Sequence, residues 1–113
     1  MDDALQARKY EQTVTLAYTC LEGFFKAFVR RNLRKEDEDE IIALARMIKD
    51  YLRKANAEYP DDVLNLITQS AHALNKTRDG FSDSHFGEEA ERWLAMYMRD
   101  LVNTQIRLLL HFM

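Results

Sequence analysis

The chain has 113 residues, 47% of them apolar, and a formal net charge of −3, with only three glycines and one proline. This length suits a single domain, residues 1–113, that buries a core of its own. So few turn-forming residues speak against a β-sandwich or barrel, and the single cysteine excludes an internal disulfide framework. The acidic balance disfavours a surface that binds duplex DNA through many phosphates, but the 16 lysines and arginines leave room for a small basic site.

Charged residues interrupt the apolar ones too often for a transmembrane helix, which needs about 18 apolar residues in a row. The N-terminus, Met1-Asp2-Asp3, is acidic where a secretory signal begins with basic residues. With its single cysteine, the chain is expected to be cytoplasmic and to have no membrane partner.

Two helical segments are expected in the first half of the chain. Apolar residues recur at steps of three and four from Leu5 to Leu33, the spacing of one helical face. A second segment with the same period covers Asp37 to Ala57, and acidic residues occupy its first turn, as the helix dipole favours. The wholly polar run from Lys35 to Glu40 is expected to be a solvated connection that merges into that turn.

Two more helical segments are expected in the second half. The third begins near Asp61, after Pro60, a residue favoured at helix starts, and ends at Lys76 or Thr77. The fourth, from Gly87 to Phe112, is apolar around much of its circumference. A helix of that kind is either central to a fold or shared with a partner chain. Four such helices predict an up-and-down four-helix bundle, and the broad fourth helix favours a homodimer.

One long interruption rich in Gly, Ser and Asp separates the third and fourth segments, from Arg78 to Phe86. Arg78 continues the face that contains Ala71 and Leu74, so we expect it to point towards a neighbouring helix. His85 comes just before the fourth segment, where free backbone N–H groups attract anions. A permanently charged guanidinium beside an imidazole that titrates near neutrality has the chemistry to hold a phosphodiester and move protons during its cleavage.

A structural role accounts for the same residues. An arginine at a helix end commonly pairs with an acid such as Asp79 or Asp83, and a lone histidine at a helix start is often a surface residue. Glu22 interrupts the apolar run of the first segment and is either exposed or a buried counter-ion of Arg78. The three histidines are too dispersed for a zinc site, so no metal or other cofactor is expected.

The residues around the interruption resemble a known family. The stretch from Leu74 to Phe86, LNKTRDGFSDSHF, is similar to the signature of the abortive-infection C-terminal domains, which belong to the HEPN superfamily of helical ribonucleases. That signature is an arginine, usually followed by a polar residue, and then a histidine after a short spacer. The stretch from Thr15 to Gly23 resembles the first helix of that branch, with Glu22 at its acidic position. The His-x-Tyr ending of the nucleotidyltransferase-partnered branch is absent, because Gly87 takes the place of the tyrosine.

The resemblance implies a dimeric, metal-independent endoribonuclease that acts in defence against phage. In such an enzyme Arg78 would steady the phosphate, and His85 would act as general acid or base while the ribose 2′-hydroxyl attacks the adjacent phosphate. Two Arg–His motifs would share one cleft between the protomers. The residues that would orient these groups or contact RNA are Asn75, Asp79, Ser82, Asp83 and Glu22.

Two other functions stay open at this point. The same helices suit a non-catalytic module that dimerises or binds RNA or protein through its fourth helix. They also suit an antitoxin-type regulator in a two-protein system. The resemblance further allows the chain to be the C-terminal domain of a longer protein, with a sensor domain or an operon partner.

Overall fold

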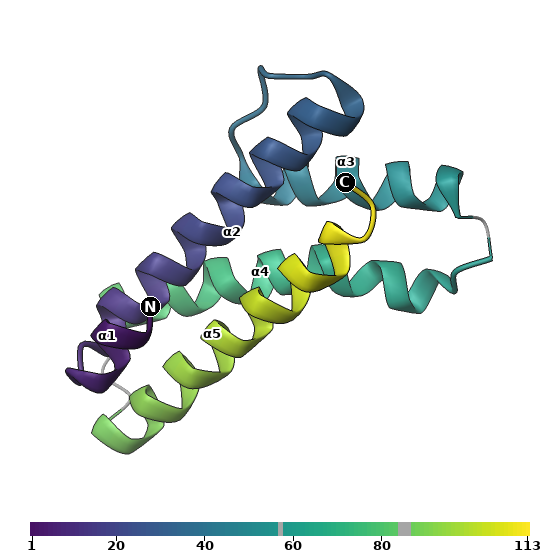
Figure 1. Cartoon of the computed structure of the whole chain (residues 1–113). Coiled ribbons are helices and arrows are strands. Elements are labelled where there is room, and N and C mark those ends of the chain that lie inside the picture. The colour runs from purple at the N-terminus through teal and green to yellow at the C-terminus, as the bar shows by residue number, and fades with distance from the viewer. Residues whose placement is uncertain (57, 84–86) are drawn as a thin grey trace.

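Five α-helices form the described part of the computed structural model, which covers residues 1–56, 58–83 and 87–113, without the side chains of residues 82 and 83 (Figure 1). No strand occurs in these residues, so the prediction of an all-α fold is confirmed. The helices are α1 (Asp2–Gln6), α2 (Tyr10–Leu33), α3 (Ile41–Ala55), α4 (Asp61–Asp83) and α5 (Glu88–Leu110). None of the helices within the described ranges combines the length and the apolarity needed to cross a membrane.

A break at Arg8 divides the expected first segment, Leu5–Leu33, into α1 and α2. Arg8 has a positive φ of 60°, and two hydrogen bonds close the end of α1: Lys9 N–H donates to the Ala4 carbonyl at 2.8 Å and Arg8 N–H donates to the Leu5 carbonyl at 3.1 Å. This is the Schellman pattern, in which glycine usually occupies the left-handed position. The sequence has arginine there, which is why the apolar period passes over the break.

The third segment continues beyond its expected end. α4 runs to Asp83 instead of Thr77, and Gly80 lies inside it although glycine destabilises the interior of a helix. Phe81 explains the extension, because its side chain is only 8% exposed and belongs to the hydrophobic core. Burial of this ring holds the last turn of α4 in place, so most of the predicted loop from Arg78 to Phe86 is helical.

The expected up-and-down topology is wrong. α2 and α5 start at the same end of the molecule and run in the same direction (Figure 1). Arg8, just before α2, forms an ion pair with Glu88 of α5 at 3.4 Å, and Asn32 near the end of α2 donates to the Phe112 carbonyl just beyond α5 at 2.8 Å. Contacts at both ends therefore show that the two helices are parallel.

The connection of residues 34–40 explains the parallel arrangement. It leads back along α2, so that Asp39 forms an ion pair with Lys26 at 3.6 Å. From there α3 crosses α2, and Tyr51 of α3 packs edge-on against Phe28 with the ring centroids 5.9 Å apart. α3 and α4 form a hairpin, closed by a hydrogen bond of 3.0 Å between Arg53 and Asp61.

The apolar pattern puts Trp93 and Tyr97 on the main apolar line of the fourth segment, but the buried line of α5 is a different one. Ala95, Met98 and Val102 face the core, whereas Trp93 and Tyr97 are 57% and 64% exposed. The broad apolar arc of this helix is therefore only partly covered by the rest of the chain.

Glu40 provides a test of the α3 boundary. Its carboxylate accepts hydrogen bonds from the backbone N–H groups of Ile42 and Ala43, at 3.0 and 2.9 Å. Loss of such a cap costs about 0.5–2 kcal/mol, so Glu40→Ala should lower the free energy of unfolding by that amount in urea titrations. Asp37→Ala removes an exposed carboxylate from the same connection and should have little effect. Equal losses in the two variants would contradict the capping role.

Candidate functional site

Arg78 lies against α2, as its position on the apolar face of the third segment predicts. The central carbon of its guanidinium lies 3.8 Å from the centroid of the Tyr18 ring, well within the range of about 6 Å for a cation–π contact. The side chain is 37% exposed. Arg78 is thus held in a defined orientation while part of its surface still faces solvent.

Two further residues named from the sequence lie beside this guanidinium. Asn75, one turn earlier on α4, accepts a hydrogen bond of 3.3 Å from Arg78 Nη2 through its Oδ1. The Asp79 carboxylate is 3.9 Å from the same nitrogen and is 59% exposed. Because exposed ion pairs of this length contribute little, Asn75 is the more effective of the two in orienting Arg78.

Glu22 is neither fully exposed nor a buried counter-ion of Arg78, the two alternatives that the sequence leaves open. Its side chain is 28% exposed and forms an ion pair with Lys26 at 3.6 Å. Lys26 in turn pairs with Asp39 at the same distance. The negative charge of Glu22 nevertheless acts on Tyr18, whose pKa it helps to raise. Glu22 therefore belongs to the electrostatic surroundings of the Arg78–Tyr18 contact.

Tyr18 is a member of this cluster that the sequence reasoning missed. The apolar period assigns it to the core stripe of the first segment, and only the packing of α4 on α2 brings it to Arg78. Burial raises the pKa of its phenol, the positive charge of Arg78 lowers it, and the charges of Glu22 and Glu40 raise it again. The net direction is upward, so the phenol stays protonated at neutral pH.

His85 and the side chains of Ser82 and Asp83 lie outside the described residues. The distance between the imidazole and the Arg78 guanidinium therefore stays a prediction. α4 ends at Asp83 and α5 begins at Glu88, so His85 falls between the two helices in the sequence.

Within the part of the chain that the structure describes, no three His, Cys, Asp or Glu side chains come together as ligands for a metal ion. Comparisons of the chain with known protein families, with characterised proteins and with solved structures found no match. The site is therefore interpreted from its own geometry.

The contact between Arg78 and Tyr18 is testable by titration. Since the charge of Arg78 lowers the pKa of Tyr18, Arg78→Met should raise that pKa further, measured by tyrosinate absorbance with Tyr18→Phe to identify the signal. Arg31→Met, which removes an exposed arginine of α2 about 20 Å farther along the helix, should leave it unchanged. An unchanged pKa in Arg78→Met would argue against the contact.

The same titration has a consequence for stability. Because the pKa of Tyr18 in the folded protein lies above its ordinary value of 10.0, the unfolded chain loses this proton first as the pH rises. The contribution of Tyr18 to stability is therefore present below pH 10.0 and lost above it.

Proposed function

We propose that this protein is a metal-independent endoribonuclease of the HEPN type, with RNA as its substrate and phage defence as its role. The observation that carries the proposal is the fixed, half-buried guanidinium of Arg78 in the last turns of α4, shortly before His85 in the sequence. Arginine binds phosphate through a rigid, permanently charged donor group. A preoriented donor of this kind favours the negative charge that develops during phosphodiester cleavage.

Each step of the proposed reaction requires a specific group. A general base removes the proton of the ribose 2′-hydroxyl, and the 2′-oxygen then attacks the adjacent phosphorus. The bond from phosphorus to the 5′-oxygen breaks, and a general acid protonates the leaving 5′-oxygen, which yields a 2′,3′-cyclic phosphate and a 5′-hydroxyl. His85 is the proposed acid or base, and Arg78 neutralises the non-bridging oxygens. Asn75 accepts from Arg78 through Oδ1, which leaves its amide N–H groups to contact RNA.

Cleavage is measured on a pool of single-stranded RNA in the presence of EDTA. His85→Ala should reduce the rate by about 10²–10⁴-fold, the usual contribution of general acid–base catalysis. Arg78→Met should also reduce it, because phosphate binding is lost. His72→Ala removes an exposed histidine of α4 and should cleave as the unaltered protein does. The proposal fails if no RNA is cleaved, or if His85→Ala cleaves at the full rate.

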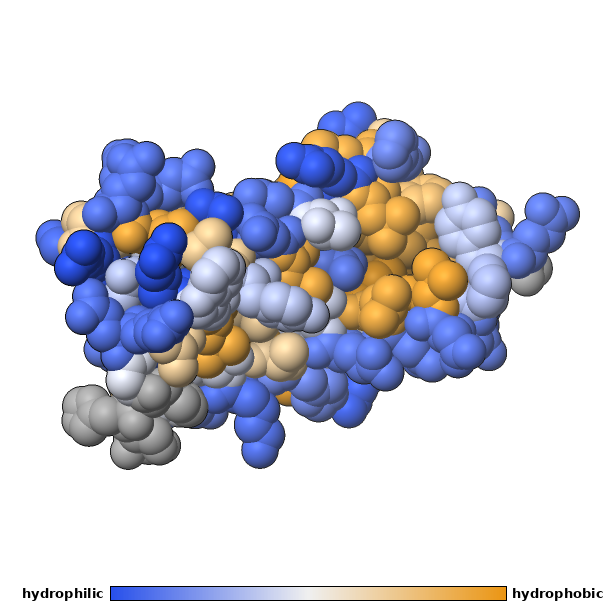
Figure 2. Space-filling view, turned by 90° about the horizontal axis from the view of Figure 1, so that it is seen from below, coloured by the Kyte–Doolittle hydropathy of each residue, from blue (hydrophilic) through white to orange (hydrophobic). Residues whose placement is uncertain are grey.

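A homodimer through α5 is the second part of the proposal, and the exposed apolar side chains of the molecule support it. Seen from below, apolar groups gather into a broad area on the side where α4 and α5 lie (Figure 2). An exposed apolar area of this extent favours a protein interface. The large apolar side chains of these two helices that are exposed are Val63, Leu66, Trp93, Tyr97 and Leu110. The same area suits a non-catalytic dimerisation module if no cleavage is found.

The charges of α5 favour a second copy of this chain as the occupant. Glu89 and Arg107 lie on one line of the helix about five turns apart, on the same side of the exposed Trp93 and Tyr97. Neither forms an ion pair within the described part of the chain. In an antiparallel pair of α5 helices related by a two-fold axis, each Glu89 would lie opposite Arg107 of the other copy. The starts of the two α5 helices would then lie about 30 Å apart along the pair, so this dimer would not bring the two Arg–His motifs into the single cleft that the resemblance implies.

Charge reversal tests this arrangement. Glu89→Arg and Arg107→Glu should each shift the protein from dimer to monomer, because like charges then face one another across the axis. The double variant restores opposite charges and should dimerise again, as measured by light scattering after size-exclusion chromatography. Asp37→Arg, outside this surface, serves as the control. A monomeric wild type, or a double variant that stays monomeric, would rule out the antiparallel pairing.

A further inference from the structure

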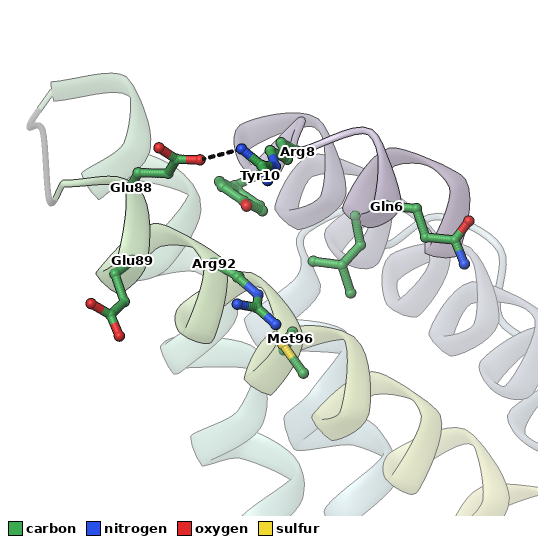
Figure 3. A pocket seen from close by; sticks show the side chains of 8 residues that line it. Gln6, Arg8, Tyr10, Glu88, Glu89, Arg92 and Met96 are labelled. Atoms are coloured by element: carbon green, nitrogen blue, oxygen red, sulfur yellow. Dashed lines mark hydrogen bonds and ion pairs between the residues drawn. The ribbon is translucent and has the colours of Figure 1, made fainter.

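A pocket of about 650 Å³ opens where α1 ends and where α2 and α5 begin (Figure 3). Its volume lies within the range of about 300–1,000 Å³ that is usual for small-ligand sites. Leu5, Tyr10 and Met96 provide an apolar floor, and Arg8, Glu88 and Arg92 provide charged groups at the rim. One of its lining residues, Glu88, is the first residue of α5.

The ion pair at the rim of the pocket is weak enough for a ligand to replace one of its members. The ion pair between Arg8 and Glu88 measures 3.4 Å, and its two side chains are 76% and 68% exposed. An exposed pair of this kind is weak, so that a phosphate group can take the place of the Glu88 carboxylate on Arg8. Arg92 reaches towards the same space from the next turn of α5 (Figure 3), and Glu89 also lines the pocket.

The backbone at Arg8 also indicates a function for its side chain. Arg8 occupies the left-handed position at the end of α1, with a φ of 60°, where glycine would be more stable. Residues held in such sparsely populated conformations cluster at binding and catalytic sites. At this position glycine would relieve the strain but would remove one of the two guanidinium groups that line the pocket.

We propose that this pocket binds one nucleotide of a single-stranded RNA, with the base on the apolar floor and the phosphate between Arg8 and Arg92. The inference rests on the proposed function, because the pocket includes the first turn of α5, which follows His85 closely in the sequence. The apolar floor suits any base, since every base has an apolar face. The two guanidinium groups suit the phosphate.

Binding is measured without cleavage by using a fluorescent RNA oligonucleotide that carries 2′-O-methyl groups, because it lacks the attacking hydroxyl. Arg8→Gly keeps the backbone conformation at this position and removes the guanidinium, and Arg92→Met removes the second one. Each should weaken binding about tenfold and make it less dependent on salt, by a slope of about 0.7 per lost phosphate contact. Glu88→Gln should strengthen binding several-fold, because it removes the carboxylate that competes for Arg8.

Arg31→Met, which removes an exposed arginine of α2, is the matched control and should bind RNA as the wild type does. Unchanged affinity in both Arg8→Gly and Arg92→Met would overturn the site. Adenosine monophosphate should bind at least a hundredfold more weakly than the oligonucleotide, and equal affinity would overturn the assignment to an RNA strand.

The outcome separates this inference from the proposed function. His85→Ala should bind the oligonucleotide normally. If binding is normal and depends on Arg8 but no unmodified RNA is cleaved, the RNA-binding pocket would be supported and the ribonuclease activity would be rejected. If RNA is cleaved but its binding does not depend on Arg8 or Arg92, the ribonuclease activity would be supported and the RNA-binding pocket would be rejected.

Discussion

Burial of one face of α2 is the constraint on which the other helices depend. Leu21, Phe25 and Phe28 have no exposed surface, and each of the other helices packs against α2. Full burial of a large apolar side chain contributes about 1.5–3 kcal/mol, so this face outweighs the weak surface ion pairs. It determines where α3, α4 and α5 lie, and its flank presents Tyr18 to Arg78.

Apolar period alone predicts the helical class and places α5 within a few residues of its observed bounds. It misses features that depend on single residues or on contacts far apart in the sequence. Arg8 ends α1 in a conformation that glycine normally adopts, and Gly80 stays helical because Phe81 is buried. The parallel course of α2 and α5 follows from a connection that leads back along α2, and a polar run of this kind has no period that reveals its path.

In the candidate site, too, contacts within one helix could be predicted from the sequence, and contacts between helices could not. The direction of Arg78 follows from its place on the helical face of Ala71 and Leu74, and Asn75 is within reach because it lies one turn earlier on the same helix. Tyr18 could not be predicted as a partner of Arg78. Their contact depends on the position of α4 along the axis of α2, which the sequence does not give. Glu22 and Lys26 lie one turn apart on the same helix and form an ion pair. This spacing allows the pair but does not predict it, because each side chain also has other partners within reach.

The parallel course of α2 and α5 has an electrostatic consequence for the end where both begin. In an antiparallel pair, the positive end of one helix dipole lies beside the negative end of the other and their fields largely cancel. Here Arg8, just before α2, touches Glu88 at the start of α5, so two positive helix ends lie together, each equivalent to about half an elementary charge. The three glutamates in the first turn of α5 therefore offset two helix ends. This local balance is one that a net charge of −3 does not reveal.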